Sequence, residues 1–174
     1  MLGENFRKEN NGNLSEDEIT NNVVGECFLD ITVIDFFLGG EWYGLEIKYI
    51  QEVIKPPKIF SIPGTPNYLL GAINHRGNII TVMDLASFLK IGLVNLSNES
   101  RIIIIRVGEL KMGLIVDSVS EIFTIPAKSI EPPLSVLDIS KMAYILGEYQ
   151  RKDKLVILLN LLNLVKTEGI IIDC

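Results

Sequence analysis

The sequence predicts an all-β protein built from two similar halves. Short runs rich in β-branched and aromatic residues, such as "ITVIDFFL" at 31–38 and "RIIIIRV" at 101–107, alternate with turn signals along the chain. Frequent short strands of this kind are typical of barrels and sandwiches. Apolar residues make up 48% of the 174 residues, so a chain of this length can bury a substantial core. Motifs that recur in the same order divide the fold into two halves.

The first half begins with a predicted hairpin. Gly39 and Gly40 separate the strand-like run at 31–38 from "EWYGLEI" at 41–47, which is a typical hairpin pattern. "YIQEVIKPP" at 49–57 ends in two prolines, which cannot continue a central strand. "FSIPGTPNYLL" at 60–70 reads as a loop and "NIITVMDL" at 78–85 as a strand. "LASFLKI" at 85–91 predicts a short helix with Asp84 as its N-cap.

The second half repeats this alternation. A polar loop at 95–100 leads to the strand at 101–107, and "GE" turns the chain into the strand-rich run at 110–125. "DKLVILLNLLNLV" at 153–165 predicts a strand followed by a helix. We expect residues 1–27 to form a flexible polar tail, residues 28–167 to form one domain with two subdomains, and residues 168–174 to form a C-terminal tail.

Composition excludes several classes of function. The net charge of −6 disfavours nucleic-acid binding, because phosphate neutralisation supplies most of that affinity. The two cysteines, Cys27 and Cys174, lie far apart with no metal-binding pattern, so we expect neither a metal nor a cofactor. The longest apolar stretch, 155–165, contains two asparagines and is too short for a membrane span. With no signal peptide evident, we expect a cytoplasmic protein that does not insert into membranes.

The internal repeat consists of two blocks in the order A-B-A′-B′. "GLEIKYIQEVI" from Gly44 aligns with "GLIVDSVSEIF" from Gly113, an offset of 69. "YLLGAINHRGNIITVMDL" at 68–85 aligns with "YILGEYQRKDKLVILLNL" at 144–161, an offset of 76. Pro-Pro pairs at 56–57 and 132–133 fit the second offset, so we expect seven extra residues between 122 and 132. Each half is too small for a deep core, so the halves are expected to pack together with a groove at their junction.

No complete catalytic motif is present. His75 is the sole histidine, and neither GxSxG nor a phosphate-binding glycine loop occurs. Asp84 and Asp117 each follow an apolar run, but their counterparts in the other half are not acidic, which favours a structural role in capping or turns. An enzyme that uses His75, Arg76 and one of these aspartates is therefore an alternative with little support.

One polar pairing recurs in both halves. Glu52 and Arg76 align with Glu121 and Lys152, so each half places an acid after block A and a base at the turn of block B. These residues form either a surface ion pair that fixes the turn or the polar rim of a protein-binding face. In the second interpretation the apolar centre of the face is formed by Ile50, Val53 and Val119.

The motifs carry a resemblance to a known family. "YGLEIKYIQEVI", "IPGTPNYLLGAINHRGNIITVMDL", "MGLIVDSVSEI" and "YILGEYQRKDKLVILLNL" resemble CheW-type chemotaxis coupling proteins over about residues 30–166. The resemblance implies two intertwined SH3-like five-stranded β-barrels with short helices, one of them near the C-terminus. It also implies a non-enzymatic adaptor that couples methyl-accepting chemoreceptors to the histidine kinase CheA and regulates the kinase. The alternative is a CheW-like scaffold in a non-flagellar chemosensory pathway.

The resemblance also implies where partners bind. The receptor tip is expected in the groove between the barrels, and the CheW-like regulatory domain of CheA is expected to dock end-on. The positions tied to protein binding are Ile50, Glu52, Val53, Gly71, Arg76, Gly113, Val119 and Ile122. We assign Ile50, Glu52, Arg76, Val119 and Ile122 to the receptor side and leave the kinase side unplaced. Two positions depart from the family pattern: His75 replaces a usual leucine, and Ala86 replaces a usual basic residue.

Overall fold

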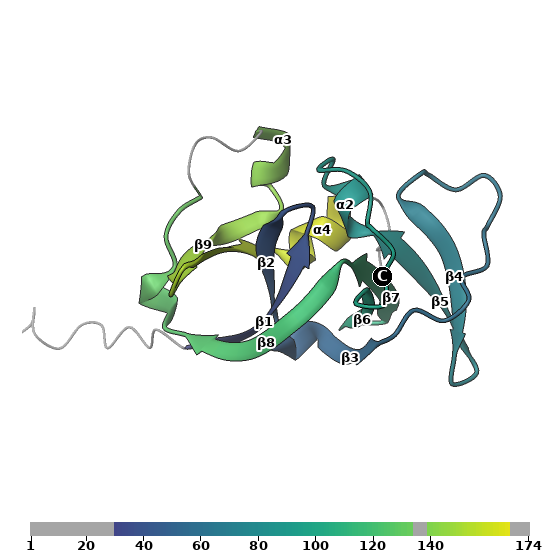
Figure 1. Ribbon diagram of the computed structural model, residues 1–174, viewed down its shortest axis with the longest axis horizontal. Coiled ribbons are helices and arrows are strands. Elements are labelled where there is room, and N and C mark those ends of the chain that lie inside the picture. The colour runs from purple at the N-terminus through teal and green to yellow at the C-terminus, as the bar shows by residue number, and fades with distance from the viewer. Residues whose placement is uncertain (1–29, 134–138, 168–174) are drawn as a thin grey trace, which may run out of the picture.

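Two five-stranded β-sheets form the body of the protein (Figure 1). The computed structural model describes residues 30–133 and 139–167, so the predicted tails at 1–27 and 168–174 lie outside the described residues. Sheet A has the strand order β8-β1-β2-β10-β9, and sheet B has the order β3-β6-β7-β5-β4. The strands are β1 (Ile31–Leu38), β2 (Glu41–Glu46), β3 (Ile50–Ile54), β4 (Leu69–His75), β5 (Asn78–Asp84), β6 (Arg101–Val107), β7 (Leu110–Val116), β8 (Ser118–Ile125), β9 (Ile145–Arg151) and β10 (Lys154–Leu159).

The helices are all short. They are α2 (Leu85–Phe88), α3 (Ile139–Met142) and α4 (Leu161–Thr167), with 3₁₀ turns η2 (Ile47–Tyr49) and η3 (Ala127–Ser129). Asp84 caps α2 by accepting the backbone N–H of Ser87 at 3.0 Å, as predicted, and Asn160 caps α4 in the same way at 3.1 Å from the N–H of Asn163. Among the described residues, none of these helices is long and apolar enough to cross a membrane.

Local sequence accounts for the strands. Gly39 and Gly40 both take positive φ angles, of 59° and 94°, as the tight turn between β1 and β2 requires. The run of four isoleucines at 102–105 is buried on both faces of β6. Ile103 and Ile105 face the main core, whereas Ile102 and Ile104 face a second cluster, so an uninterrupted apolar run is consistent with a strand.

Each sheet takes strands from both halves of the chain. Sheet A joins β1 and β2 of the first half to β8, β9 and β10 of the second, and sheet B reverses this division. Two of the pairs that join the halves, β1 with β8 and β3 with β6, are antiparallel. The other two are parallel: Leu158 of β10 lies opposite Gly44 of β2, and Val82 of β5 lies opposite Gly113 of β7. The repeat makes these two pairs equivalent, because the offset of 69 relates Gly44 to Gly113 and the offset of 76 relates Val82 to Leu158. The predicted intertwining of the halves is thereby confirmed, and these equivalent pairs are what the predicted duplication would produce.

The predicted alignment of the two Pro-Pro pairs is wrong. Phe60 bridges Ala72 in sheet B, and Glu131 bridges Glu148 at the equivalent place in sheet A. Pro56 and Pro57 precede their bridging residue, whereas the prolines at 132–133 follow theirs. Phe60 and Glu131 differ by 71, so the extra residues are divided between the segment before Glu131 and the segment that contains α3.

The main core lies between the two sheets and joins the halves. It combines residues of both sheets with side chains from α2 and α4, so that neither half has a separate interior. Its fully buried members include Phe36, Leu38, Leu45, Met83, Leu85, Ile103, Ile105, Leu114, Val116, Leu164 and Val165. Smaller clusters fill the opposite faces of the two sheets.

Candidate functional site

The edge strands β3 and β8 occupy equivalent places in sheets B and A. Both lie along the lower side of the molecule in Figure 1. The 69-residue offset pairs Ile50 with Val119, and Val53 with Ile122. Three of these predicted apolar site residues, Ile50, Val53 and Val119, pack against the same core cluster although they come from opposite halves of the chain. Ile122 lies opposite Ile34, a member of that cluster.

Both edge strands contain a β-bulge at the equivalent point. Along β3, the partner residue on β6 moves by one from Ile105 to Ile104 while β3 moves by two, from Ile50 to Glu52. An extra residue reverses the normal alternation of side chains along a strand. Ile50 and Val53 are three residues apart, yet both pack against the main core. The bulge thus places two side chains on one face that a regular strand would separate.

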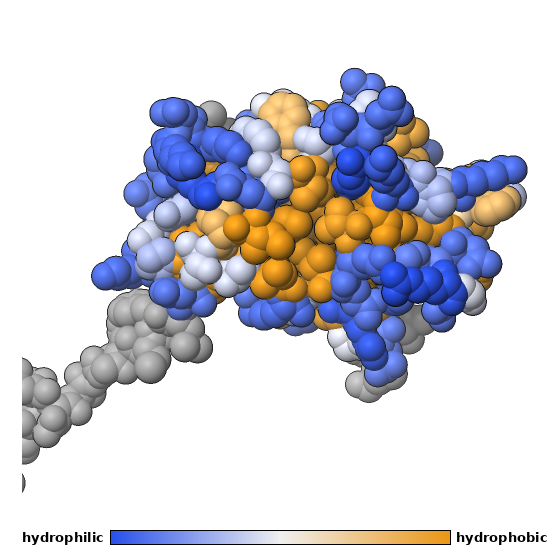
Figure 2. All heavy atoms as spheres, turned by 60° about the horizontal axis from the view of Figure 1, so that its bottom comes forward, coloured by the Kyte–Doolittle hydropathy of each residue, from blue (hydrophilic) through white to orange (hydrophobic). Residues whose placement is uncertain are grey.

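The apolar centre of this face is partly open to solvent. Ile50, Val53 and Val119 are half-buried against the core, and Ile122 is 55% exposed. In Figure 2, the lower side of Figure 1 is turned toward the reader, and apolar atoms gather at its centre with polar groups around them. We call the surface of Ile50, Val53, Val119 and Ile122 the β3–β8 face.

The first acid–base cluster lies beside this face. The Glu52 carboxylate accepts a hydrogen bond from Arg76 at 3.0 Å, which confirms the predicted pair, and His75 Nε2 lies 3.1 Å from its other oxygen. The His75 contact was not predicted; its side chain is only 16% exposed. Together with Gln51, Asn78 and Lys111, these three residues line a polar hollow of about 210 Å³.

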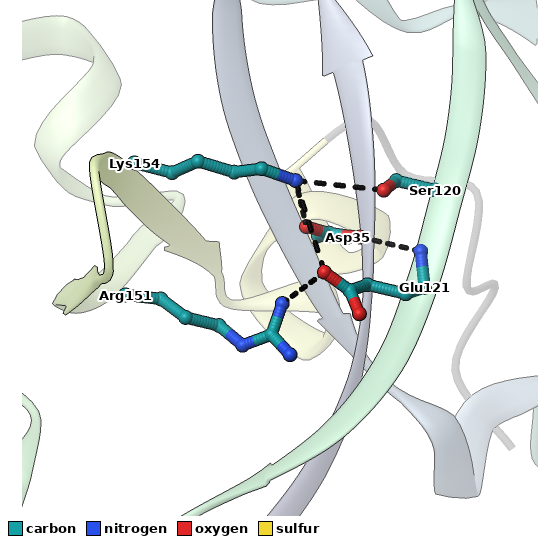
Figure 3. Close-up of polar contacts among 5 residues, drawn as sticks. All are labelled: Asp35, Ser120, Glu121, Arg151 and Lys154. Carbon is teal, nitrogen blue, oxygen red and sulfur yellow. Dashed lines mark hydrogen bonds and ion pairs between the residues drawn. The ribbon is translucent and has the colours of Figure 1, made fainter.

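The second cluster uses different residues from those predicted (Figure 3). Glu121 pairs with Arg151 of β9, and Lys154 Nζ lies 3.9 Å from its carboxylate. Hydrogen bonding to Arg151 lowers the pKa of the Glu121 carboxyl below its ordinary value. Lys152, the predicted partner, is exposed at the tip of the turn, where its φ of 51° matches the 52° of Arg76.

Arg151 aligns with His75 at the 76-residue offset. The last residue of the strand before the turn therefore faces the acid in both halves. Arg151 also packs its guanidinium 4.0 Å from the centre of the Phe123 ring, which holds the side chain toward β8. Side chains alternate between the two faces of a strand, and this alternation could have identified Arg151, rather than Lys152 in the turn, as the partner of Glu121.

The known proteins that this chain matches agree on one family. The CheW-like domain family matches residues 32–169. The chain belongs to the CheW-like family. It is 31% identical over 138 residues to the chemotaxis protein CheW of Helicobacter pylori, covering 78% of this chain and 81% of that protein. The CheW of Klebsiella aerogenes is 28% identical over 152 residues, covering 87% and 88%.

A solved relative confirms the fold. The scaffolding protein TtCheW from Thermoanaerobacter tengcongensis matches with a TM-score of 0.68 and 40% sequence identity, covering 76% of this chain and 90% of that one. The predicted all-β, intertwined SH3-like class is therefore confirmed. Family membership also supports the predicted role: a CheW-like chain is a chemotaxis adaptor rather than an enzyme.

Two predicted site glycines of this CheW-like chain are buried. A Cβ on Gly71 would lie 2.1 Å from the carbonyl oxygen of Phe60, and a Cβ on Gly113 would lie 2.6 Å from Ile102. Both positions therefore need glycine for close packing. Their assignment to protein binding stays a prediction, and the β3–β8 face does not depend on it.

The candidate catalytic groups of the CheW-like chain have structural partners. Asp84 accepts backbone N–H groups of Ser87 and Val94, at 3.0 and 3.2 Å. Asp117 accepts those of Gly39 and Asn95, at 3.0 and 2.8 Å, and so ties the β1–β2 turn to the loop before β6. Across residues 30–133 and 139–167, no three metal-ligating side chains form a cluster.

Proposed function

We propose that the chain couples methyl-accepting chemoreceptors to the histidine kinase CheA and that the β3–β8 face receives the receptor. The proposal is supported by family membership and by the chemistry of the face, an apolar centre beside charged clusters. Protein-binding surfaces commonly combine such a centre with a polar rim. The receptor side would consist of Ile50, Glu52, Arg76, Val119 and Ile122.

One observation carries the proposal. Ile50 and Val53 of the first half and Val119 of the second pack against the same core cluster, although they come from the edges of different sheets. A receptor bound across them would contact both halves at once. A change of receptor conformation would then alter the contacts of both halves of the adaptor.

The mechanism is bivalent binding. The receptor occupies the β3–β8 face, and the CheW-like regulatory domain of CheA docks end-on at a separate surface. Because a ligand shifts an equilibrium only through its different affinities for the two states, the adaptor must bind one kinase state more tightly. A core shared by both halves suits this task, because a change at the receptor contact acts on packing that belongs to both halves.

A matched pair of charge reversals tests the site. Arg76→Glu removes the ion pair with Glu52 and places a negative charge beside the face. Lys152→Glu makes the same charge change at the equivalent turn position, with nearly the same φ. Isothermal titration with a receptor cytoplasmic fragment should show at least about a tenfold loss of affinity for Arg76→Glu and less than about a threefold loss for Lys152→Glu.

Stability separates binding from folding in this test. Arg76 is 74% exposed, so its ion pair contributes less than about 1 kcal/mol to the free energy of unfolding. Equal losses of affinity in the two variants would contradict the assignment of Arg76. A fall in melting temperature large enough to explain the loss would show that Arg76 is structural. If the unmodified chain bound neither receptor fragment nor CheA, the coupling function itself would be wrong.

A further inference from the structure

A buried carboxylate breaks the likeness between the two sheets. Asp35 lies in the middle of β1 and is fully buried. The equivalent position in sheet B, 69 residues later, is Ile104, which is buried in an apolar cluster. A buried charge is costly unless it is paired and hydrogen-bonded. Because the equivalent position in sheet B is apolar, the fold does not require a carboxylate here, and the presence of Asp35 calls for another explanation.

The reason lies at the bulge of β8. The pairing of β1 with β8 shifts between Ile34 and Phe36, which places Asp35 opposite the extra residue of β8. A bulge leaves a backbone group without its partner in the ladder. One oxygen of Asp35 accepts the backbone N–H of Glu121 at 2.7 Å. The carboxylate thus replaces the missing ladder partner at the point where β8 changes the direction of its side chains.

Lys154 forms an ion pair with Asp35, and the charge of Arg151 also acts on it. Lys154 Nζ, from β10, lies 3.3 Å from the second oxygen of Asp35 and 3.8 Å from the centre of the Trp42 ring. Figure 3 shows Lys154 reaching from the β9–β10 hairpin to Asp35, Ser120 and the carboxylate of Glu121. The network joins β10, β1 and β8 across the sheet.

We infer that Asp35, with Lys154, is a positioning residue for the partner-binding face. It fixes the bulge of β8 and so sets the direction of Val119 and Ile122 toward the partner. The inference rests on the proposed function, since it concerns the same face. The equivalent bulge of β3 has Ile104 in this place, so the dependence is confined to the β8 side.

Two substitutions at Asp35 separate its two bonds. Asp35→Ile copies the residue of sheet B and removes both the acceptor for the Glu121 N–H and the partner of Lys154. Asp35→Asn keeps an acceptor oxygen and removes the charge. Removal of one partner of an ion pair destabilises a fold when the other charge is left buried. Lys154 is 29% exposed and also lies near Glu121, so it keeps solvent and a second acid, and the melting temperature need not fall in Asp35→Ile. A change in binding without a loss of stability is the signature of a positioning role.

The experiment measures amide hydrogen exchange and receptor affinity on the full chain. In Asp35→Ile, exchange at the Glu121 amide should accelerate at least about tenfold, with the Glu52 amide in the equivalent bulge unchanged as the internal reference. The affinity for a receptor cytoplasmic fragment should fall at least about tenfold. Asp35→Asn should stay within about threefold of the unmodified chain in both measurements.

The outcomes distinguish this inference from the proposed function. If the unmodified chain does not bind the receptor fragment, the proposed function is wrong and the exchange measurement still tests the bulge. If Asp35→Ile binds as tightly as the unmodified chain, the positioning role is overturned. If Asp35→Ile does not fold, Asp35→Ala decides, because it also removes the acceptor for the Glu121 N–H: unchanged exchange at Glu121 and unchanged affinity would overturn the inference.

Discussion

Replacement of Gly71 by alanine should damage the fold at one defined contact. Gly71 has a φ of 139°, a conformation that residues with a side chain rarely adopt, and its Cβ would lie 2.1 Å from the Phe60 carbonyl oxygen. Phe60 and Ala72 exchange two backbone hydrogen bonds of 2.8 Å at this point. Alanine must therefore push the Phe60 segment away from β4 and strain both bonds.

The size of the effect follows from two contributions. An unfavourable backbone conformation costs about 1–3 kcal/mol, and overpacking of a closed contact costs about 1–3 kcal/mol. We expect Gly71→Ala to lower the free energy of unfolding by about 2–6 kcal/mol. For a chain of this size, each kcal/mol corresponds to about 2–4 °C in melting temperature. Urea unfolding followed by circular dichroism, together with a thermal scan, measures the loss.

Gly77→Ala is the matched control. Gly77 also has a positive φ, of 81°, but nothing lies within 4 Å of its added Cβ. Its replacement should carry the conformational cost alone, about 1–2 kcal/mol. If the two variants lose the same stability, the close contact with Phe60 does not constrain the fold and the argument from packing is wrong. If Gly71→Ala is stable but no longer binds receptor, Gly71 is a contact residue after all.

Two further predictions concern carboxylates. Asp84→Ala removes the cap of α2 and the acceptor of a second backbone N–H. The free energy of unfolding, measured by urea titration, should therefore fall by about 1–3 kcal/mol. An unchanged urea midpoint would show that the cap does not stabilise the fold. Because Arg151 lowers the folded-state pKa of Glu121, this carboxyl adds stability above its ordinary pKa, and that contribution is lost as pH falls through the lowered value. Urea midpoints measured from neutral to acidic pH should therefore fall less in Glu121→Gln than in the unmodified chain; equal slopes would show that the ion pair is not formed in solution.

The sequence predicted the elements that depend on local chemistry. The β1–β2 turn followed from Gly39 and Gly40, and the cap of α2 followed from an aspartate before a short helical pattern. The Glu52–Arg76 pair was also predicted correctly, because the repeat aligned the same types of charge. Each of these features depends on residues whose type restricts the backbone or requires an opposite charge.

The incorrect and missing predictions concern side chains whose contacts depend on neighbouring strands. Lys152 was expected to pair with Glu121, but an offset gives the position of a residue in a turn and not the direction of its side chain. Arg151 points to β8 because it ends a strand next to Phe123, which only the pairing of the sheet reveals. Asp35 was missed because its partners come from residues more than 80 positions away.

The parallel pairing of β2 with β10 and of β5 with β7 has a consequence for the origin of the chain. One half alone has five strands but would have to assemble each sheet with strands that only another half supplies. Two identical copies could supply them to each other by exchanging strands, as in a domain-swapped homodimer. The intertwined chain thus has the arrangement expected of a symmetric dimer whose subunits became fused. Later substitutions, such as Asp35 against Ile104, then made the two halves of the fused chain different.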